Sequence, residues 1–219
     1  PVWVHAVSLG ETRAAQPLIE ALLERGLPVL LTNMTATGRT EASRLFATAI
    51  AQGRLRQVWL PYDLPGAVRR CFRYFTPRCG LLIETEVWPN LIRAGKHYAV
   101  PLALVSARMS EASLRKNLRL ASLARQTFGS LDQVLAQTQE DADRLTQLGA
   151  RSPKVVGNPK FDFRPPPDQL GGGNIVLVLL DHDGAAHGAG ILHPETQAYR
   201  DHQHRKRAHG VKPVTEHGL

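Results

Sequence analysis

The chain has 219 residues, 43% of them hydrophobic, which is enough for one large domain with a packed core. Its net charge of +8 arises before residue 171, because residues 1–170 hold 22 basic and 14 acidic residues whereas residues 171–219 hold five of each. No stretch approaches the roughly 18 consecutive apolar residues of a spanning helix, and the spacing of Cys71 and Cys79 matches neither a zinc site nor a redox pair. We therefore expect reduced cysteines, no metal or other cofactor, and an anionic partner such as nucleic acid, a phosphorylated substrate or an acidic membrane surface.

Short apolar runs alternate along the chain with segments of helical periodicity. The runs expected to be strands are residues 2–7, 28–32, 57–60, 81–84, 102–105 and 134–136. The segments expected to be helices are residues 11–26, 38–51, 65–75, 88–97, 111–128 and 139–148. This alternation predicts a Rossmann-like α/β fold, in which helices cover both faces of a parallel sheet.

The periodic pattern ends near residue 165. We therefore expect one domain over residues 1–165 and an irregular, disordered or out-of-frame tail over residues 166–219. The tail contains seven of the nine histidines, but their irregular spacing matches no known metal site.

Polar clusters recur where an apolar run gives way to a helical segment. They are Ser8-Leu9-Gly10-Glu11, Thr35-Ala36-Thr37-Gly38, Pro61-Tyr62-Asp63, Glu84-Thr85-Glu86-Val87-Trp88-Pro89-Asn90, Ser106-Ala107-Arg108-Met109-Ser110 and Gly157-Asn158-Pro159-Lys160-Phe161-Asp162. In an open parallel sheet all strand ends of one polarity lie along one edge, and ligands bind in the crevice there. The six clusters are therefore predicted to line one site.

Carboxylates in two of these clusters are candidates for acid–base chemistry. Glu11 follows a Ser-x-Gly turn in the first turn of a helix, where the helix dipole favours the ionised form that a general base needs, although a glutamate is ordinary at this position. Glu84 and Glu86 end an apolar strand, and both would lie on one side if the strand continued. These two carboxylates either take part in catalysis or binding, or cap the next helix. His5 in the first strand is interpreted as a core or edge histidine.

Cationic side chains in two further clusters are candidates for anion binding. An arginine fork at Arg108, flanked by Ser106 and Ser110, suits a phosphate or a carboxylate. Lys160 and Asp162 either contribute to anion binding in the same way or form a surface ion pair. A dinucleotide or P-loop nucleotide site is disfavoured, because the chain contains no Gly-x-Gly-x-x-Gly and no Walker sequence.

A dense basic group lies at Arg69, Arg70, Arg73 and Arg78, with aromatic residues interleaved. Arginines beside aromatic rings are typical of nucleic-acid binding. The aromatic residues here also fit the buried stripe of an amphipathic helix, and this second interpretation is favoured.

Taken together, the six clusters resemble those of the bacterial Kdo transferases, the 3-deoxy-D-manno-octulosonic acid transferases of lipopolysaccharide synthesis. The resemblance runs in unbroken order from about residue 1 to residue 163, and the string Glu84-Thr85-Glu86-Val87-Trp88-Pro89-Asn90 is its most specific part. It implies the acceptor-binding N-terminal half of a two-domain GT-B glycosyltransferase. It also implies transfer of Kdo from CMP-Kdo to the lipid A precursor, lipid IVA, at the cytoplasmic face of the inner membrane, with no role for nucleic acid.

The resemblance implies Glu11 as the general base of an inverting displacement and Glu86 as a second important carboxylate. Residues expected to bind substrates are Ser8, Gly10, Thr35, Gly38, Glu84, Arg108, Ser110 and Lys160. Ser106, Met109 and Pro159 depart mildly from the family's pattern.

Two larger differences from the family concern the ends of the chain. The N-terminal anchor usual in the family is absent, and the tail lacks the motifs of the donor-binding second domain. We therefore expect a truncated chain. The alternatives are another GT-B glycosyltransferase and a non-enzymatic anion-binding or RNA-binding α/β module.

Overall fold

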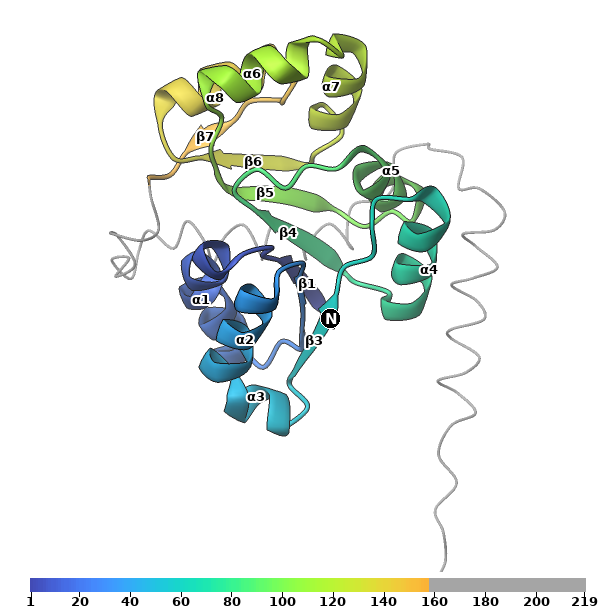
Figure 1. Ribbon diagram of the computed structural model, residues 1–219, viewed down its shortest axis with the longest axis vertical. Coiled ribbons are helices and arrows are strands. Elements are labelled where there is room, and N and C mark those ends of the chain that lie inside the picture. The colour runs from blue at the N-terminus through green and yellow to red at the C-terminus, as the bar shows by residue number, and fades with distance from the viewer. Residues whose placement is uncertain (158–219) are drawn as a thin grey trace, which may run out of the picture. The chain divides into compact units, whose positions relative to one another are not determined.

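The computed structural model describes residues 1–157, in which seven parallel strands form one sheet in the order β3-β2-β1-β4-β5-β6-β7 (Figure 1). The strands are β1 (Val2–His5), β2 (Val29–Asn33), β3 (Leu55–Trp59), β4 (Cys79–Ile83), β5 (Leu102–Ala107), β6 (Gln133–Ala136) and β7 (Lys154–Val155). The helices are α1 (Leu9–Glu24), α2 (Ala36–Leu45), α3 (Ala47–Ala51), α4 (Pro65–Phe75), α5 (Pro89–His97), α6 (Glu111–Leu118), α7 (Ala121–Phe128) and α8 (Gln139–Gln147).

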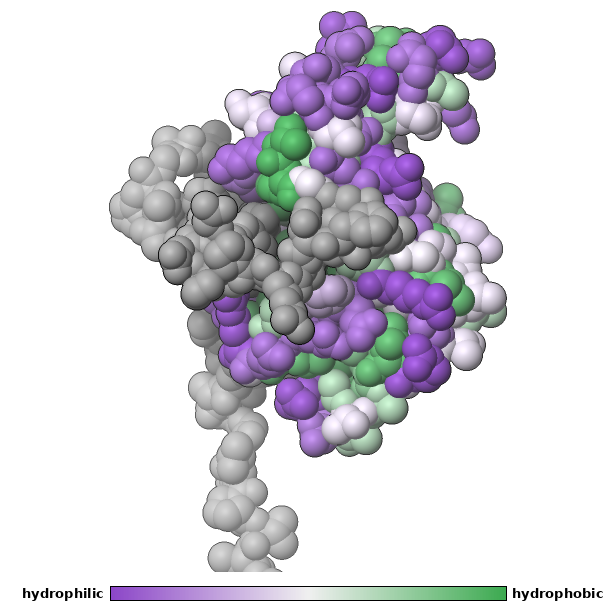
Figure 2. Space-filling view, turned by 90° about the vertical axis from the view of Figure 1, so that its left-hand side faces the viewer, coloured by the Kyte–Doolittle hydropathy of each residue, from purple (hydrophilic) through white to green (hydrophobic). Residues whose placement is uncertain are grey.

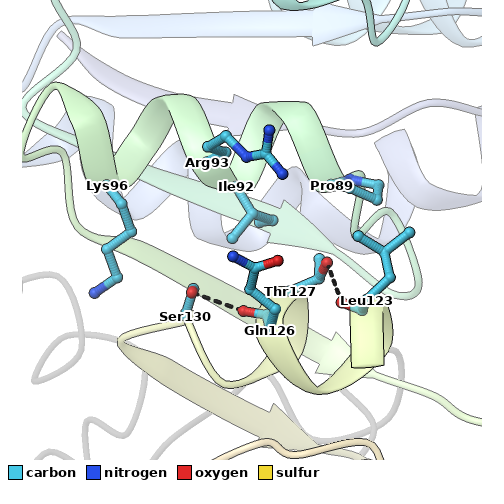
Figure 3. Close-up of a pocket in the computed structure, with 8 residues that line it drawn as sticks. All are labelled: Pro89, Ile92, Arg93, Lys96, Leu123, Gln126, Thr127 and Ser130. Carbon is cyan, nitrogen blue, oxygen red and sulfur yellow. Dashed lines mark hydrogen bonds between the residues drawn. The ribbon is translucent and has the colours of Figure 1, made fainter. Parts of the chain in front are cut away.

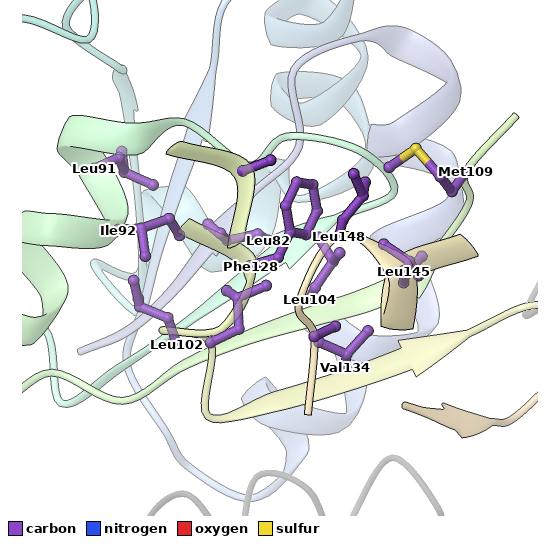
Figure 4. Close-up of a cluster of buried hydrophobic side chains, with 14 of the residues drawn as sticks. Leu82, Leu91, Ile92, Leu102, Leu104, Met109, Phe128, Val134, Leu145 and Leu148 are labelled. Atoms are coloured by element: carbon purple, nitrogen blue, oxygen red, sulfur yellow. The ribbon is translucent and has the colours of Figure 1, made fainter. Parts of the chain in front are cut away.

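The sheet separates two hydrophobic cores, because successive residues of a strand point to opposite faces. Val2 and Val4 pack with α1, α2 and α3 on one face, whereas Trp3 packs with α4, α5, α6, α7 and α8 on the other. The second core includes Leu82, Leu104 and Phe128 (Figure 4). The prediction of a Rossmann-like parallel sheet with helices on both faces is confirmed.

Two predicted helices are each divided in two. Residues 38–51 form α2 and α3, which are separated at Phe46, whose backbone leaves the helical region while its ring is buried. Residues 111–128 form α6 and α7, which are separated at Arg119 and Leu120. An unbroken helix of this second length would be about 27 Å long. The turn at Leu120 instead lets α6 bury Leu114 while α7 buries Phe128.

Several predicted strand boundaries differ from the structure by one or two residues, and three differences bear on the site or on the number of strands. β1 ends at His5 rather than Val7, because the Val7 N–H bonds to the Glu11 side chain. β4 ends at Ile83, and Glu84 has a φ of 60°, so the alternation that would have placed Glu84 and Glu86 on one side does not apply. β7 was missed because its two residues are exposed and form no apolar run. The predicted boundary at residue 165, the tail, Lys160 and Asp162 lie outside the described residues.

Candidate functional site

The predicted site lies along the edge of the sheet where the strands end. The four central strands are β2, β1, β4 and β5, in that order, and each is followed by one of the polar clusters. These clusters contain Ser8 to Glu11 after β1, Thr35 to Gly38 after β2, Glu84 to Asn90 after β4, and Arg108 to Ser110 after β5. Pairing of β1 with β4 brings together residues that are more than 70 positions apart in the sequence, as in the pair Val4 and Leu81.

Glu11 is buried in the first turn of α1, where it and Ser8 form a reciprocal cap. The Ser8 hydroxyl accepts a hydrogen bond from the Glu11 backbone N–H at 3.3 Å and donates one to Glu11 Oε1 at 2.8 Å. Glu11 Oε2 accepts a hydrogen bond from the Val7 N–H at 2.8 Å. Burial raises the pKa of Glu11 and the charge of Glu84 raises it further, while the hydrogen bonds from Val7 and Ser8 oppose the rise.

Glu86 belongs to the same group of carboxylates. Burial raises the pKa of Glu86, and the negative charges of Glu11 and Glu84 add to this effect. In the opposite direction, Trp88 Nε1 donates a hydrogen bond to Glu86 Oε2 at 2.9 Å, which lowers the pKa. The structure thus brings the three predicted carboxylates together, although nothing tests their predicted roles.

The cluster after β2 packs directly against the Glu11 loop. The Thr35 hydroxyl accepts a hydrogen bond from the Gly38 N–H at 3.1 Å, which caps α2, and donates one to the Val7 carbonyl at 3.0 Å. A Cβ added to Gly38 would lie 2.9 Å from both the Ser8 carbonyl carbon and the Val7 carbonyl oxygen. Gly38 therefore permits the N-termini of α1 and α2 to lie side by side. Gly10, by contrast, is exposed in the first turn of α1.

The cluster after β5 is held by α8. Asp141 accepts a hydrogen bond from the Met109 N–H at 2.7 Å, and Arg144 donates one to the Met109 carbonyl at 3.1 Å. Ser110 caps α6 by accepting a hydrogen bond from the Ser113 N–H at 3.1 Å, so its observed role is structural. Arg108 is exposed and forms no hydrogen bond or ion pair with the described part of the chain. Its guanidinium is therefore available for an anion.

Two of the five non-glycine residues with positive φ in residues 1–157 lie at the same edge. Glu84 and Ser106, at the ends of the neighbouring strands β4 and β5, have φ values of 60° and 56°, in the left-handed region that non-glycine residues rarely occupy. The Glu84 N–H bonds to the Val105 carbonyl at 2.9 Å, and Gln137 donates to the Ser106 hydroxyl at 2.8 Å, which hold these conformations. Strained residues of this kind cluster at functional sites.

Two of the polar residues in the predicted clusters instead stabilise the fold. Asp63 accepts hydrogen bonds from the backbone N–H groups of Asn90 and Leu91 at 3.0 Å and 2.8 Å, and so caps α5 from 27 residues away. Asn90 Nδ2 donates to the Asp63 carbonyl at 2.7 Å. On α4, Val68 and Phe72 are buried while Arg69 and Arg70 are exposed, which confirms the amphipathic helix. Tyr74 is 67% exposed, however, so this aromatic residue does not belong to the buried stripe.

The sequence did not predict that aromatic packing connects a buried histidine to the carboxylates at this edge. His5 is fully buried and packs edge to face against Trp88, with 5.9 Å between ring centroids. Trp88 in turn bonds to Glu86. The sequence signals were the place of Trp88 within the cluster after β4 and the place of His5 three residues before the cluster after β1.

A small groove lies apart from these residues, between α5 and α7 (Figure 3). Its volume is about 130 Å³, and Ile92, Arg93, Lys96, Leu123 and Gln126 are among its lining residues. Pro89, from the cluster after β4, also lines it, but none of the residues predicted to be catalytic or to bind substrate does. Across residues 1–157, no group of three His, Cys, Asp or Glu side chains is suited to hold a metal ion. Within the same range, no helix has the length and apolar character needed to cross a membrane.

Solved structures support the fold. A UDP-GlcNAc 2-epimerase from Neisseria meningitidis bound to UDP-GlcNAc is similar with a TM-score of 0.51 at 15% identity, over 72% of this chain and 47% of that chain. Another UDP-N-acetylglucosamine 2-epimerase gives a TM-score of 0.50 at 12% identity, over 71% of this chain and 47% of that chain. At these identities the likeness shows the fold alone.

Sequence comparisons identify the family. Residues 1–163 match the family model of 3-deoxy-D-manno-octulosonic-acid transferase (kdotransferase). The chain is 61% identical over 170 residues to a 3-deoxy-D-manno-octulosonic acid transferase of Bordetella pertussis, covering 78% of this chain and 40% of the relative. A transferase of the same name from Haemophilus influenzae is 28% identical over 166 residues, covering 74% and 38% respectively. The chain thus spans about two fifths of the length of these relatives, and it belongs to the 3-deoxy-D-manno-octulosonic acid transferase family.

Proposed function

We propose that this domain provides the acceptor side and the general base for transfer of Kdo from CMP-Kdo to a hydroxyl group of the lipid A precursor. The observation that supports this most directly is the position of Glu11. Its carboxylate lies at the N-terminus of α1, in the strand-end edge that binds ligands in open parallel sheets, and has a pKa raised chiefly by burial. A raised pKa makes the ionised carboxylate a stronger proton acceptor.

The hydrogen bonds of Glu11 are compatible with a role as base. Oε1 and Oε2 each accept one hydrogen bond, from Ser8 and Val7 respectively. Each carboxylate oxygen can accept a second, so an acceptor hydroxyl can bind without displacing the cap. These bonds also fix the orientation of the carboxylate, which reduces the entropy lost on reaching a reactive geometry.

The proposed reaction is a single inverting displacement. The acceptor oxygen forms a bond to the anomeric carbon of Kdo, its proton passes to Glu11, and the bond from that carbon to the phosphate oxygen of CMP breaks. Glu86 and Glu84 lie near enough to Glu11 for their charges to affect one another. Their negative charge favours protonation of Glu11 as the hydroxyl proton leaves the acceptor.

Substitution of Glu11 by Gln tests the base. A suitable enzyme is a chimera in which residues 1–163 replace the matching segment of the Bordetella pertussis relative, because that relative includes the remaining length. We expect Glu11→Gln to lower the rate of transfer by about 100-fold to 10,000-fold with little change in acceptor binding. Glu20→Gln, an exposed substitution on the same helix, is the matched control. A Glu11→Gln rate close to that of the control would exclude Glu11 as the base.

Arg108 is proposed to bind a phosphate of the acceptor. It is exposed at the end of β5 and has no protein partner among the described residues. In the same chimera, Arg108→Ala should weaken binding of the phosphorylated acceptor by about 1.5 to 3 kcal/mol and affect a dephosphorylated analogue much less. Arg69→Ala, which removes an exposed arginine of α4, is the control. Equal losses of binding affinity for both acceptors would show that Arg108 does not bind the phosphate.

An acidic membrane surface is proposed as a further partner, and the turn between α6 and α7 is the surface that suits it best. Leu118, Leu120 and Leu123 are exposed there. On the face of the described domain that Figure 2 shows, hydrophobic residues lie among hydrophilic ones. The basic residues nearby in sequence or across the groove are Arg93, Lys96, Arg115, Lys116 and Arg119. Exposed apolar side chains beside cations favour the interface of an anionic bilayer.

Binding of the chain to lipid vesicles tests this surface. Sedimentation with vesicles that contain anionic phospholipid should exceed sedimentation with phosphatidylcholine alone, and Leu120→Ser should reduce it. Leu64→Ser provides a matched control, because Leu64 is 62% exposed and Leu120 is 66% exposed. Equal effects of the two substitutions would assign no special role to the α6–α7 turn. RNA binding that survives moderate salt and is lost in Arg69→Ala would favour the RNA-binding alternative instead.

A further inference from the structure

His5 is a buried histidine that the proposed chemistry does not use. It ends β1, is fully buried, and lies between two indole rings. Its ring centroid is 6.0 Å from that of Trp3, with the rings tilted by 33°, and 5.9 Å from that of Trp88, with the rings nearly perpendicular at 80°. Its Nδ1 atom lies 2.8 Å from the Thr32 hydroxyl.

The Thr32 hydroxyl links His5 to Trp3 and to the β1 backbone. Trp3 Nε1 lies 2.9 Å from the Thr32 hydroxyl and can only donate, so the hydroxyl oxygen accepts this bond. The hydroxyl proton then has two possible acceptors, His5 Nδ1 at 2.8 Å and the Val4 carbonyl at 3.5 Å. Nδ1 either accepts from the Thr32 hydroxyl or donates to it, according to the tautomer of the imidazole, and in both cases the bond ties His5 to Thr32.

Burial also keeps the ring neutral. It lowers the pKa of His5 from 6.5 to about 4, so at pH 7 the imidazole carries no charge. Nε2 is buried and has no hydrogen-bond partner in the described part of the chain. His5 therefore has one hydrogen bond, to Thr32, which fixes the ring to the sheet. Its other side is available for aromatic packing against Trp88.

Trp88 connects this packing to the carboxylates. It precedes α5, and its Nε1 donates to Glu86 Oε2 at 2.9 Å. Glu86 lies in the irregular segment between β4 and α5, outside any helix or strand. A side chain in such a segment depends on contacts from rigid elements for its position.

We propose that His5 is a positioning residue that holds the Trp88 indole, and through it the Glu86 carboxylate, in place from the centre of the sheet. The series of contacts runs from Thr32 through His5 and Trp88 to Glu86. Any effect on Kdo transfer depends on the proposed function, whereas the positioning itself does not.

The charges around Glu86 explain why the position of Trp88 matters. The charged groups that act on Glu86 are Glu11 from α1 and Glu84 from the end of β4, and both raise the pKa of Glu86. The indole N–H of Trp88 is the hydrogen-bond donor that opposes them. Movement of the indole away from Glu86 should therefore raise the pKa of Glu86 further.

Nuclear magnetic resonance on the 219-residue chain labelled with ¹⁵N-tryptophan tests the proposal without requiring activity. The chain has three tryptophans, Trp3, Trp59 and Trp88, and the Trp88 indole signal should follow the ionisation of Glu86. In Glu86→Gln, which has no carboxylate at this position, the pH-dependent change caused by Glu86 should disappear, which identifies it. In His5→Leu, which removes both the hydrogen bond and the aromatic ring, we expect the Trp88 signal to shift and the Glu86 midpoint to rise by about 0.5 pH unit or more. His5→Phe, which retains a ring, should show a smaller change.

Val4→Ala is the control for a general loss of packing. Val4 is as fully buried as His5 and lies on the same strand, but it packs in the core on the opposite face of the sheet. It should lower stability and leave both the Trp88 signal and the Glu86 midpoint unchanged. The proposal is overturned if His5→Leu leaves them unchanged, or if Val4→Ala changes them equally.

Trp88→Phe provides a second test that leaves the sheet intact. It removes the donor to Glu86, so the Glu86 midpoint, read from the side-chain carboxyl carbon, should rise at least as much as in His5→Leu. In the Trp88→Phe background, His5→Phe should cause no further change. An additive change would show that His5 acts on Glu86 by another route and would overturn the proposal. If the midpoints move as expected while the chimera transfers no Kdo, the positioning stands and the proposed function fails.

Discussion

Ser8 and Glu11 cap each other: the Ser8 hydroxyl accepts from the Glu11 backbone at 3.3 Å and donates to the Glu11 carboxylate at 2.8 Å. One pair of residues therefore begins α1 and orients the carboxylate that we propose as the base. The arrangement is a capping box, except that Glu11 Oε2 reaches the N–H of Val7 rather than that of Ser8 itself.

Replacing Ser8 by Ala should affect both properties at once. We expect the free energy of unfolding to fall by about 1 kcal/mol through loss of the cap. The pKa of Glu11 should rise, since the hydrogen bond from Ser8 lowers it. Urea unfolding and a carbon-13 titration of the Glu11 side chain measure the two effects. Ser110→Ala, which removes the corresponding cap of α6, should cost similar stability and leave the Glu11 pKa unchanged.

Two glycines from the predicted site should respond in opposite ways to substitution by Ala. A Cβ at Gly38 would lie 2.9 Å from the Ser8 backbone, so Gly38→Ala must separate α2 from the Glu11 loop. At Gly10 the nearest atom would be 3.9 Å away. Since Ala is about 0.5 to 1 kcal/mol more favourable than Gly within a helix, Gly10→Ala should be neutral or stabilising. Urea unfolding measures the stability of both variants. Equal destabilisation by the two substitutions would contradict the close packing of Gly38 against the Ser8 backbone.

The elements and the edge could be predicted from the sequence because both depend on local patterns. Apolar runs identify strands, helical spacing identifies helices, and polar clusters identify strand ends. The proximity of Glu11 to Glu84 and Glu86 depends in addition on the pairing of β1 with β4, which no local pattern contains. The proximity of these carboxylates could therefore be predicted from the expected sheet, in which strand ends meet at one edge, but not from the sequence motifs alone.

Features that arise from tertiary contacts were missed or misread. The cluster containing Asp63 was expected to line the site, yet its carboxylate caps α5 across a separation of 27 residues. The break before α7 lies at Arg119 and Leu120, and the helical periodicity of the sequence continues across it. The link from His5 to Trp88 joins a strand to a distant loop. Sequence spacing does not report such contacts, because each depends on how separate elements pack.

The cap of α5 should contribute measurably to stability. In Asp63→Ala the backbone N–H groups of Asn90 and Leu91 lose their acceptor, and we expect a loss of about 1 to 2 kcal/mol in the free energy of unfolding. Asp63→Asn should retain part of it, because the amide oxygen still accepts. Asp143→Ala, at an exposed position of α8, is the control for removal of a negative charge. A loss no greater than that of the control would refute the capping role.

The buried His5 should make the stability of the protein depend on pH. Because burial lowers its pKa from 6.5 to about 4, the unfolded chain binds a proton between these values whereas the folded chain does not. The contribution of His5 is therefore fully present above pH 6.5 and is lost as the pH falls towards 4, with a maximum of about 3 kcal/mol.

The difference between wild type and a variant isolates this contribution from that of other groups. Glu11 and Glu86, whose pKa values are raised, act in the opposite sense, since their protonated forms favour the folded state as the pH falls. We expect the free energy of unfolding of His5→Phe to decrease less than that of wild type between pH 6.5 and pH 4. Parallel pH profiles for wild type and His5→Phe would mean that His5 is already neutral in the unfolded chain or still protonates when folded, and would remove the basis for a buried neutral imidazole.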